Sequence, residues 1–254
     1  MTILQLVGAI GIAYGPASAL FIITIAREPL RIIVMMSGMF FWLLSLLLSS
    51  LWWFMFVGLR DKIAFGLTFS ILFQEMFRYA LYLLLSKAEA GLQTFSQNEE
   101  ERRHADGSVT DSKKHEYAYV AGLGFGIMSG LFALINVLDD SSGPGTVGIH
   151  DGSLNFLITS AFFTMIMILL HIMWNVVFYW GLENEKYWAP VLVVLSHLLV
   201  SELTLLKGDR LYMIALPIAV INLLVMSVIA FIGVGGSMNT IIAACSCKRR
   251  QYQL

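Results

Sequence analysis

The sequence predicts an all-α, polytopic membrane helical bundle with seven transmembrane helices, forming a single membrane domain over residues 1–254. The composition is 58% hydrophobic and 13% charged, about half the charge of an average soluble domain. The charged residues gather between long apolar stretches that approach or exceed the roughly 20 residues needed to cross hydrocarbon as a helix. The stretches are unbroken rather than alternating, which favours helices over barrel strands.

Seven apolar stretches are expected to span the bilayer. The first has no Lys or Arg before it and is too long for a signal-peptide core, so it is interpreted as a retained span. The second is the longest and the sixth the shortest, which permits tilt. Pro16 and Pro217 are expected to kink the first and the seventh. In chain order the stretches cover residues 3–25, 32–58, 63–85, 117–138, 154–180, 188–206 and 211–234.

The connections between spans are polar. The long one, about 87–116, has too little apolar surface for a core of its own and is predicted to be a mobile cytosolic loop. The segment 139–153 contains Asp-Asp-Ser-Ser-Gly-Pro-Gly, which predicts a tight turn region. Residues from about 235 to 254 form the predicted cytosolic tail. Its Cys245 and Cys247, beside three basic residues, are either palmitoylation sites or ordinary free thiols.

The basic residues predict the orientation. Because Lys and Arg favour the cytoplasmic side, the N-terminus is expected to be lumenal or extracellular and the C-terminus cytosolic. A net charge of −1 with no basic face argues against binding to nucleic acid. Eleven Lys and Arg lie on the predicted cytosolic side and four on the other: Arg27, Arg31, Lys87, Arg102, Arg103, Lys113, Lys114, Lys186, Lys248, Arg249 and Arg250 against Arg60, Lys62, Lys207 and Arg210.

The fourth stretch carries a glycine face. Gly122, Gly126 and Gly130 recur every four residues, so they share one side of a helix. Without side chains there, another helix can approach closely enough for dispersion contacts that lipid tails do not match. Two interpretations stay open: a packing groove inside the bundle, or a seam that docks a helix of another protein. The second is favoured only by the resemblance described below.

Glu75, Arg78, His171 and His197 are ionisable residues well inside predicted spans. Ionisable groups in hydrocarbon are costly, so they are expected to face the bundle interior with partners. Glu75 and Arg78 are one turn apart and suit an internal ion pair. The histidines suit hydrogen-bonding roles better than a metal site, which needs a third ligand that only Glu75 is placed to supply.

Known catalytic signatures are absent from the sequence. It has no His-Glu-x-x-His helix, no phosphate-cradling loop and no dinucleotide fingerprint, so no self-sufficient active site, metal or cofactor is predicted.

Several segments closely resemble, in order along nearly the whole chain, the anterior-pharynx-defective family, the Aph subunit of gamma-secretase. The likeness leaves out only residues 90–114 and the last residues. His171 with Trp174 matches as well. The matching segments are Gly15-Pro16-Ala17, Pro29-Leu30-Arg31, Phe40–Leu43, Gln74–Arg78, Ala118–Gly130, Gly143–Gly145, Gly148–His150, Thr159–Phe162, Ser196–Leu199 and Gly235–Ser237.

The resemblance implies a non-catalytic, seven-span scaffold with a lumenal N-terminus. It implies that the chain assembles and stabilises the gamma-secretase intramembrane aspartyl protease with presenilin, nicastrin and the presenilin enhancer subunit. Such a complex cleaves type I membrane proteins such as Notch and amyloid precursor protein, in the endoplasmic reticulum, Golgi, plasma membrane and endosomes. In the family, the glycines matching Gly122, Gly126 and Gly130 serve assembly. The histidines matching His171 and His197 support assembly and presenilin maturation. Glu202 is unusual for the family, and no role is inferred for it.

Other functions compete with this interpretation. Gln74-Glu75-x-x-Arg78 with two intramembrane histidines faintly resembles the glutamate/histidine prenyl-protein protease type, although Gln74 stands where a first glutamate is expected; this pattern predicts at most an inactive site. Seven spans and an outside N-terminus also describe a receptor, but the chain has no cysteine pair for an extracellular disulfide. A transporter is disfavoured because no internal repeat is visible.

Overall fold

The computed structural model describes residues 3–56, 58, 62–100, 110–142, 154–205 and 214–237. Over these residues the chain is helical and contains no strand, which confirms the all-α part of the predicted fold class. The helices are α1 (Ile3–Leu20), the π-helical η1 (Phe21–Ile25), α2 (Pro29–Met55), α3 (Ile63–Glu100), α4 (Thr110–Ser142), α5 (Leu154–Glu183), α6 (Trp188–Leu203) and α7 (Leu216–Gly233).

Within the described part of the chain, five helices are long and apolar enough to cross a membrane, by length and composition. They are Leu4–Ile25, Pro29–Met55, Lys114–Ile135, Leu157–Glu183 and Leu216–Gly233. The apolar run of α3 is interrupted by Gln74, Glu75 and Arg78, and α6 is shorter, with 16 residues. A membrane helical bundle therefore agrees with the structure, and the count of seven spans stays a prediction.

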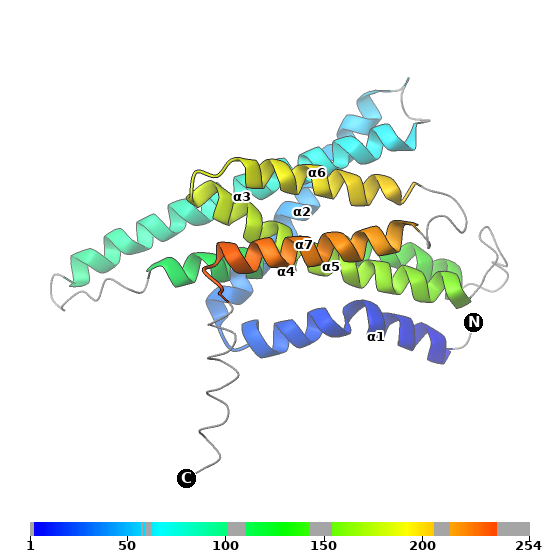
Figure 1. The fold of residues 1–254 in the computed structure, drawn as a ribbon, viewed down its shortest axis with the longest axis horizontal. Helices are drawn as coiled ribbons and strands as arrows, with labels where there is room; N and C mark the ends of the chain where they lie inside the picture. The colour runs from blue at the N-terminus through cyan, green and yellow to red at the C-terminus, as the bar shows by residue number, and fades with distance from the viewer. Residues whose placement is uncertain are drawn as a thin grey trace, which may run out of the picture.

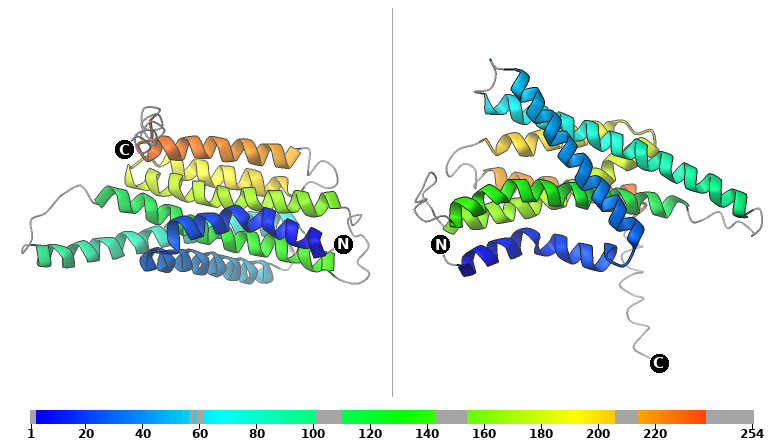
Figure 2. Two further views of the ribbon diagram at one scale, coloured as in Figure 1. Left: turned by 90° about the horizontal axis from the view of Figure 1, so that it is seen from below. Right: turned by 180° about the vertical axis from the view of Figure 1, so that it is seen from behind.

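Helix α5 lies at the centre of the bundle. It packs against α4, α7, α1 and α6, and α2 crosses α4 obliquely (Figures 1 and 2). Both Trp174 and Leu170 of α5 are fully buried. The helix carries apolar residues on all of its faces, as a helix in the middle of a bundle does. By contrast, α1 and α7 leave large apolar side chains such as Leu4 and Leu224 exposed, which suits helices whose solvent is lipid.

The prediction of a loop over 87–116 is wrong at both of its ends. Helix α3 continues to Glu100 and α4 begins at Thr110, and residues 101–109 lie outside the described part. The prediction equated low apolar content with a lack of secondary structure. The segment Lys87–Gln93 is nevertheless rich in Ala, Glu, Lys and Leu, which have high helix propensity, so the helix can continue beyond the apolar run.

Two smaller predictions also change. The turn predicted over 139–153 is wrong for residues 139–142, which belong to α4. The remaining residues, 143–153, lie outside the described part of the chain, as do Cys245 and Cys247. Pro16 lies inside α1 as expected. Pro217 instead lies in the first turn of α7, where a backbone N–H has no partner within the helix, so its absence in proline removes no hydrogen bond.

Candidate functional site

The glycine face of α4 is covered by α5 of the same chain. A Cβ atom added at Gly122 would lie 2.8 Å from the Cα of Ile172, and one at Gly126 would lie 2.6 Å from the carbonyl oxygen of Ile168. At Gly130 it would meet the Ile168 side chain at 2.8 Å. The two backbones are therefore in direct contact. The interpretation of this face as a surface open to another protein's helix is wrong, because α5 already occupies it, and the internal packing groove is what the structure shows.

A second close approach joins α4 to α2. A Cβ at Gly38 would lie 2.5 Å from the carbonyl oxygen of Ala121, and one at Gly124 would clash with the carbonyl of Met35. The sequence analysis did not single out either glycine. Gly124 stands two residues from Gly122, which turns it to a different side of the helix. Helix α4 is thus held by backbone contact on two sides.

A polar cluster joins α3, α5 and α6 beside this seam. Glu75 and Arg78 of α3 form the predicted internal ion pair, with 3.0 Å between Arg78 Nε and Glu75 Oε2 and 3.1 Å between Arg78 Nη2 and Glu75 Oε1. The Arg78 side chain is fully buried, and its guanidinium also lies 5.3 Å from the ring centroid of Phe125 on α4. The pair carries opposite charges into the interior without adding net charge.

The two predicted histidines belong to the same cluster. His197 Nδ1 of α6 lies 2.7 Å from Glu75 Oε1, and His171 Nδ1 of α5 lies 3.3 Å from Arg78 Nη2. Since a carboxylate only accepts and a guanidinium only donates, His197 Nδ1 carries a hydrogen and His171 Nδ1 accepts one. The two rings are 5.1 Å apart in an edge-to-face arrangement. Glu75, Arg78, His171 and His197, predicted separately, therefore meet in one place.

Asn175 completes the cluster, and it was not among the residues predicted from the sequence. Its Oδ1 accepts a hydrogen bond from Arg78 Nη1 at 2.8 Å, and its Nδ2 donates to the carbonyl of Ala118 at 3.2 Å, which ties α4 to α3 and α5. It stands one turn after His171 on the same face of α5, and this spacing is the signal that could have found it. The cluster thereby fixes four helices relative to one another.

Two tryptophans extend these polar contacts. Trp174 donates to the hydroxyl of Ser196 at 2.6 Å and its ring lies 4.3 Å from that of His197. On the α2 side, Trp42 donates to Gln74 at 3.1 Å. Glu202, for which the sequence suggested no role, accepts a hydrogen bond from Thr68 at 2.7 Å and so links α6 to α3.

The cluster joins α3, α4, α5 and α6 through buried polar contacts. Glu75 Oε1 lies within hydrogen-bond distance of both His197 and Arg78, whereas Oε2 is buried 3.0 Å from Arg78 Nε in the ion pair and has no hydrogen bond. Within the described residues no group of three or more His, Cys, Asp or Glu side chains is placed to hold a metal ion.

Comparison with known proteins connects this geometry to a family. A family model described as Aph-1 protein matches residues 4–237. A gamma-secretase subunit Aph-1b of Danio rerio is 44% identical over 263 residues, covering 100% of this chain and 98% of that protein. A gamma-secretase subunit Aph-1 of Drosophila melanogaster is 44% identical over 248 residues, covering 98% and 100%. A gamma-secretase subunit APH-1B of Homo sapiens is 44% identical over 263 residues, covering 100% and 98%. The chain belongs to the Aph-1 family.

Proposed function

We propose that this chain is a non-catalytic scaffold subunit of a gamma-secretase complex. The single observation that supports this most is the likeness over the full length of the chain to proteins named as gamma-secretase subunits. The internal geometry supports the scaffold role, because backbone contact between α4, α5 and α2, together with the polar cluster, makes a bundle with fixed helix positions. A subunit that presents fixed surfaces can order the helices of its partners.

The proposal includes the partners and the setting of the complex. The chain binds presenilin, nicastrin and the presenilin enhancer subunit, supports presenilin maturation, and serves cleavage of type I membrane proteins such as Notch and amyloid precursor protein. It spans the membrane seven times as one domain, with the N-terminus lumenal and the C-terminus cytosolic. It resides in the endoplasmic reticulum, Golgi, plasma membrane and endosomes. The glycine face serves assembly indirectly, by holding α4 against α5.

Affinity purification tests this function. The full-length chain carrying an affinity tag is expressed in cells that lack their own Aph-1 proteins and is recovered in a mild detergent. Mass spectrometry is expected to find presenilin and nicastrin in the eluate, and the cells are expected to regain gamma-secretase activity. Recovery of the folded chain without either partner would contradict the proposal.

Replacing both histidines is expected to reduce maturation of presenilin while leaving this chain folded. In His171→Ala with His197→Ala, the Glu75–Arg78 ion pair and the Arg78–Asn175 hydrogen bond are retained, so the interior keeps no uncompensated charge. The amount of mature presenilin fragments, measured by immunoblot, is expected to fall. Circular dichroism of the purified variant checks that helix content is unchanged. Undiminished fragments in cells that depend on the variant would reject this role.

The non-catalytic assignment has its own test. Because Glu75 is engaged by Arg78 and His197, the isolated chain is expected to cleave no membrane peptide, and Glu75→Gln is expected to make no difference to that result. Cleavage by the purified chain that disappears in Glu75→Gln would instead support the glutamate/histidine protease alternative.

A further inference from the structure

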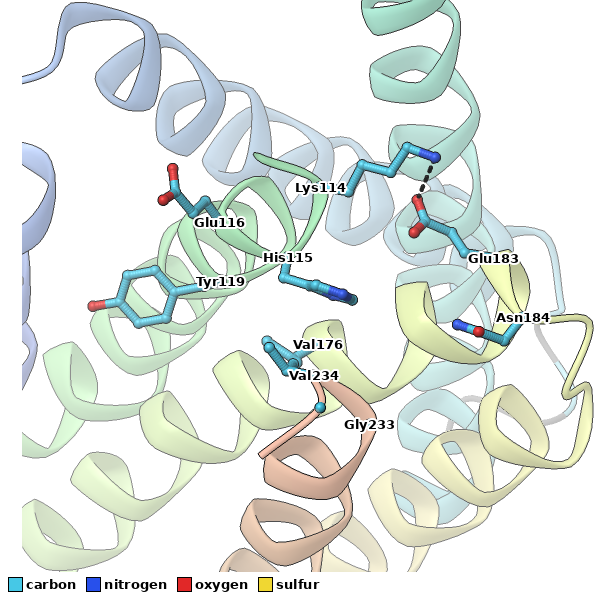
Figure 3. Close-up of a pocket in the computed structure, with 10 residues that line it drawn as sticks. Lys114, His115, Glu116, Tyr119, Val176, Glu183, Asn184, Gly233 and Val234 are labelled. Atoms are coloured by element: carbon cyan, nitrogen blue, oxygen red, sulfur yellow. Dashed lines mark ion pairs between the residues drawn. The ribbon is translucent and has the colours of Figure 1, made fainter. Parts of the chain in front are cut away.

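A cavity separate from the polar cluster opens where α4 begins and α5 and α7 end. Its volume is about 790 Å³. The residues that line it include Lys114, His115, Val176, Glu183, Asn184 and Val234 (Figure 3). Across it, His115 and Asn184 point toward one another, with Val176 and Val234 beside them (Figure 3). The cavity therefore has charged and polar groups on two sides and an apolar part.

Charges of both signs line this cavity and are only loosely paired with each other. Lys114 Nζ and Glu183 Oε1 are 3.7 Å apart, beyond hydrogen-bond distance, with side chains 36% and 18% exposed (Figure 3). The other acidic residue of the lining, Glu116, is already paired with Arg31 at 2.9 Å. Lys114 and Glu183 therefore form a long ion pair with partly exposed side chains, and a ligand that carries both charges can contact both of them.

The surroundings of Glu183 favour a positive group. The helices α5 and α7 both end at this cavity, at Glu183 and Gly233, and the C-terminus of a helix carries partial negative charge. Asn184 donates its amide hydrogen to the carbonyl of Trp180 at 2.9 Å, which leaves its side-chain oxygen as an acceptor. Lys114, whose ammonium faces Glu183 at 3.7 Å, and His115 are nitrogen-bearing side chains that can donate to an anion (Figure 3).

The cavity also lies at the ends of helices that are long and apolar enough to cross a membrane. Three of the apolar spans terminate there, one beginning at Lys114 and the others ending at Glu183 and Gly233. Nearby, Trp180 lies under the ammonium of Lys186 at 4.5 Å and packs edge-on against Trp188, as aromatic and basic residues do at a bilayer interface. In the proposed seven-span arrangement these helix ends lie at the bilayer surface, where a lipid headgroup can reach the two charges.

From these features we propose that the cavity binds the phosphoethanolamine headgroup of an aminophospholipid. The ammonium of the headgroup donates to Glu183 and to the side-chain oxygen of Asn184, and the phosphate accepts from Lys114 and His115. The two-carbon linker between them lies against Val176 and Val234. A purely anionic or purely cationic ligand would leave Glu183 or Lys114 facing a like charge.

The site is tested with the full-length chain, delipidated in detergent and titrated with phosphatidylethanolamine or phosphatidylcholine, with bound lipid measured by native mass spectrometry. Phosphatidylcholine has the same phosphate but no N–H donor. The chain is expected to bind phosphatidylethanolamine about tenfold more tightly, the effect of one hydrogen bond to a charged group. Equal affinity for the two lipids would overturn the proposal.

Three variants locate the site. Glu183→Gln is expected to abolish the preference for phosphatidylethanolamine, whereas Glu185→Gln, an equal change of charge at an exposed residue two positions away, is expected to keep it. Lys114→Gln is expected to weaken binding of both lipids, since both carry the phosphate. Circular dichroism confirms that each variant is folded. A preference that survives in Glu183→Gln, or falls equally in Glu185→Gln, would refute the assignment.

Competition with soluble phosphoethanolamine tests whether the ligand is a membrane lipid or the free headgroup. If it competes with the lipid, the headgroup alone is the ligand, and a free metabolite can occupy the cavity. If phosphatidylethanolamine binds and the soluble compound does not compete, the site belongs to membrane lipid. Binding of neither would overturn the proposal.

Discussion

Glu75→Leu is expected to lower the free energy of unfolding by about 3–5 kcal/mol, the usual cost of leaving one member of a buried ion pair without its partner. Arg78 would remain fully buried with only the neutral Asn175 and His171 as hydrogen-bond partners. Arginine stays protonated in proteins, so it has no means of shedding the charge. Denaturant titration of the purified chain in detergent, followed by circular dichroism, measures the change.

The complementary and double variants make this prediction sharper. Arg78→Leu is expected to be milder than Glu75→Leu, because Glu75 would keep His197 at 2.7 Å. Replacing both residues by Leu is expected to recover part of the lost stability, since no uncompensated charge remains and apolar side chains fill the space. A double variant no more stable than Glu75→Leu would show that the ion pair is not the source of the effect.

A surface ion pair is the matched control. Arg31 and Glu116 also pair at 2.9 Å between α2 and α4, but their side chains are 29% and 44% exposed. Water compensates either charge there, so Glu116→Leu is expected to change the free energy of unfolding by at most about 1 kcal/mol. A loss as large as that of Glu75→Leu would contradict the argument that burial sets the cost.

Gly126→Leu is also expected to destabilise the chain strongly, because it forces α4 away from α5. The first added atom would already lie 2.6 Å from the Ile168 carbonyl oxygen, which belongs to the backbone and has no rotamer to move to. Overpacking of this kind costs about 1–3 kcal/mol when side chains can adjust, and more where only backbone can. Thermal unfolding of the purified chain is expected at a lower temperature. If the proposed function holds, recovery of presenilin and nicastrin with the chain falls as well.

Gly11→Leu is the control for this substitution. Gly11 also lies inside an apolar helix, α1, but a Cβ there meets no atom within 4 Å. Because the change in residue type is identical, the comparison isolates the contact with α5 from any general effect of placing Leu in a span. The two variants unfolding at the same temperature would exclude close α4–α5 packing as the role of Gly126.

The glycine face shows which part of the site was predictable from sequence. The four-residue spacing of Gly122, Gly126 and Gly130 is a property of one helix, so the sequence alone predicts that they share a side and permit close approach. The spacing does not show which helix packs against this face. Two interpretations were therefore open, and the contacts with Ile168 and Ile172 of α5 decide between them.

In the polar cluster, too, contacts within one helix could be predicted from sequence, whereas contacts between helices could not. Glu75 and Arg78 are one turn apart, so their ion pair could be predicted, and the cost of polar groups in hydrocarbon predicted that both histidines would have partners. Asn175 follows His171 by one turn, so its side of α5 could be predicted, but its hydrogen bond to Arg78 joins residues 97 positions apart, and no local pattern predicts that contact.

The sequence by itself determined the helical class, the apolar spans, the family likeness and the polar residues that have to be satisfied inside the bundle. The helical class, the spans and the polar positions follow from composition and periodicity, and the family likeness follows from segments that match in order. All of these can be recognised along the chain without its fold. Only the tertiary structure decided that α5 covers the glycine face, that the cluster includes Asn175, and that Lys114 and Glu183 line one cavity. Such contacts join residues far apart in the chain, and they depend on how whole helices pack, which no short stretch of sequence records.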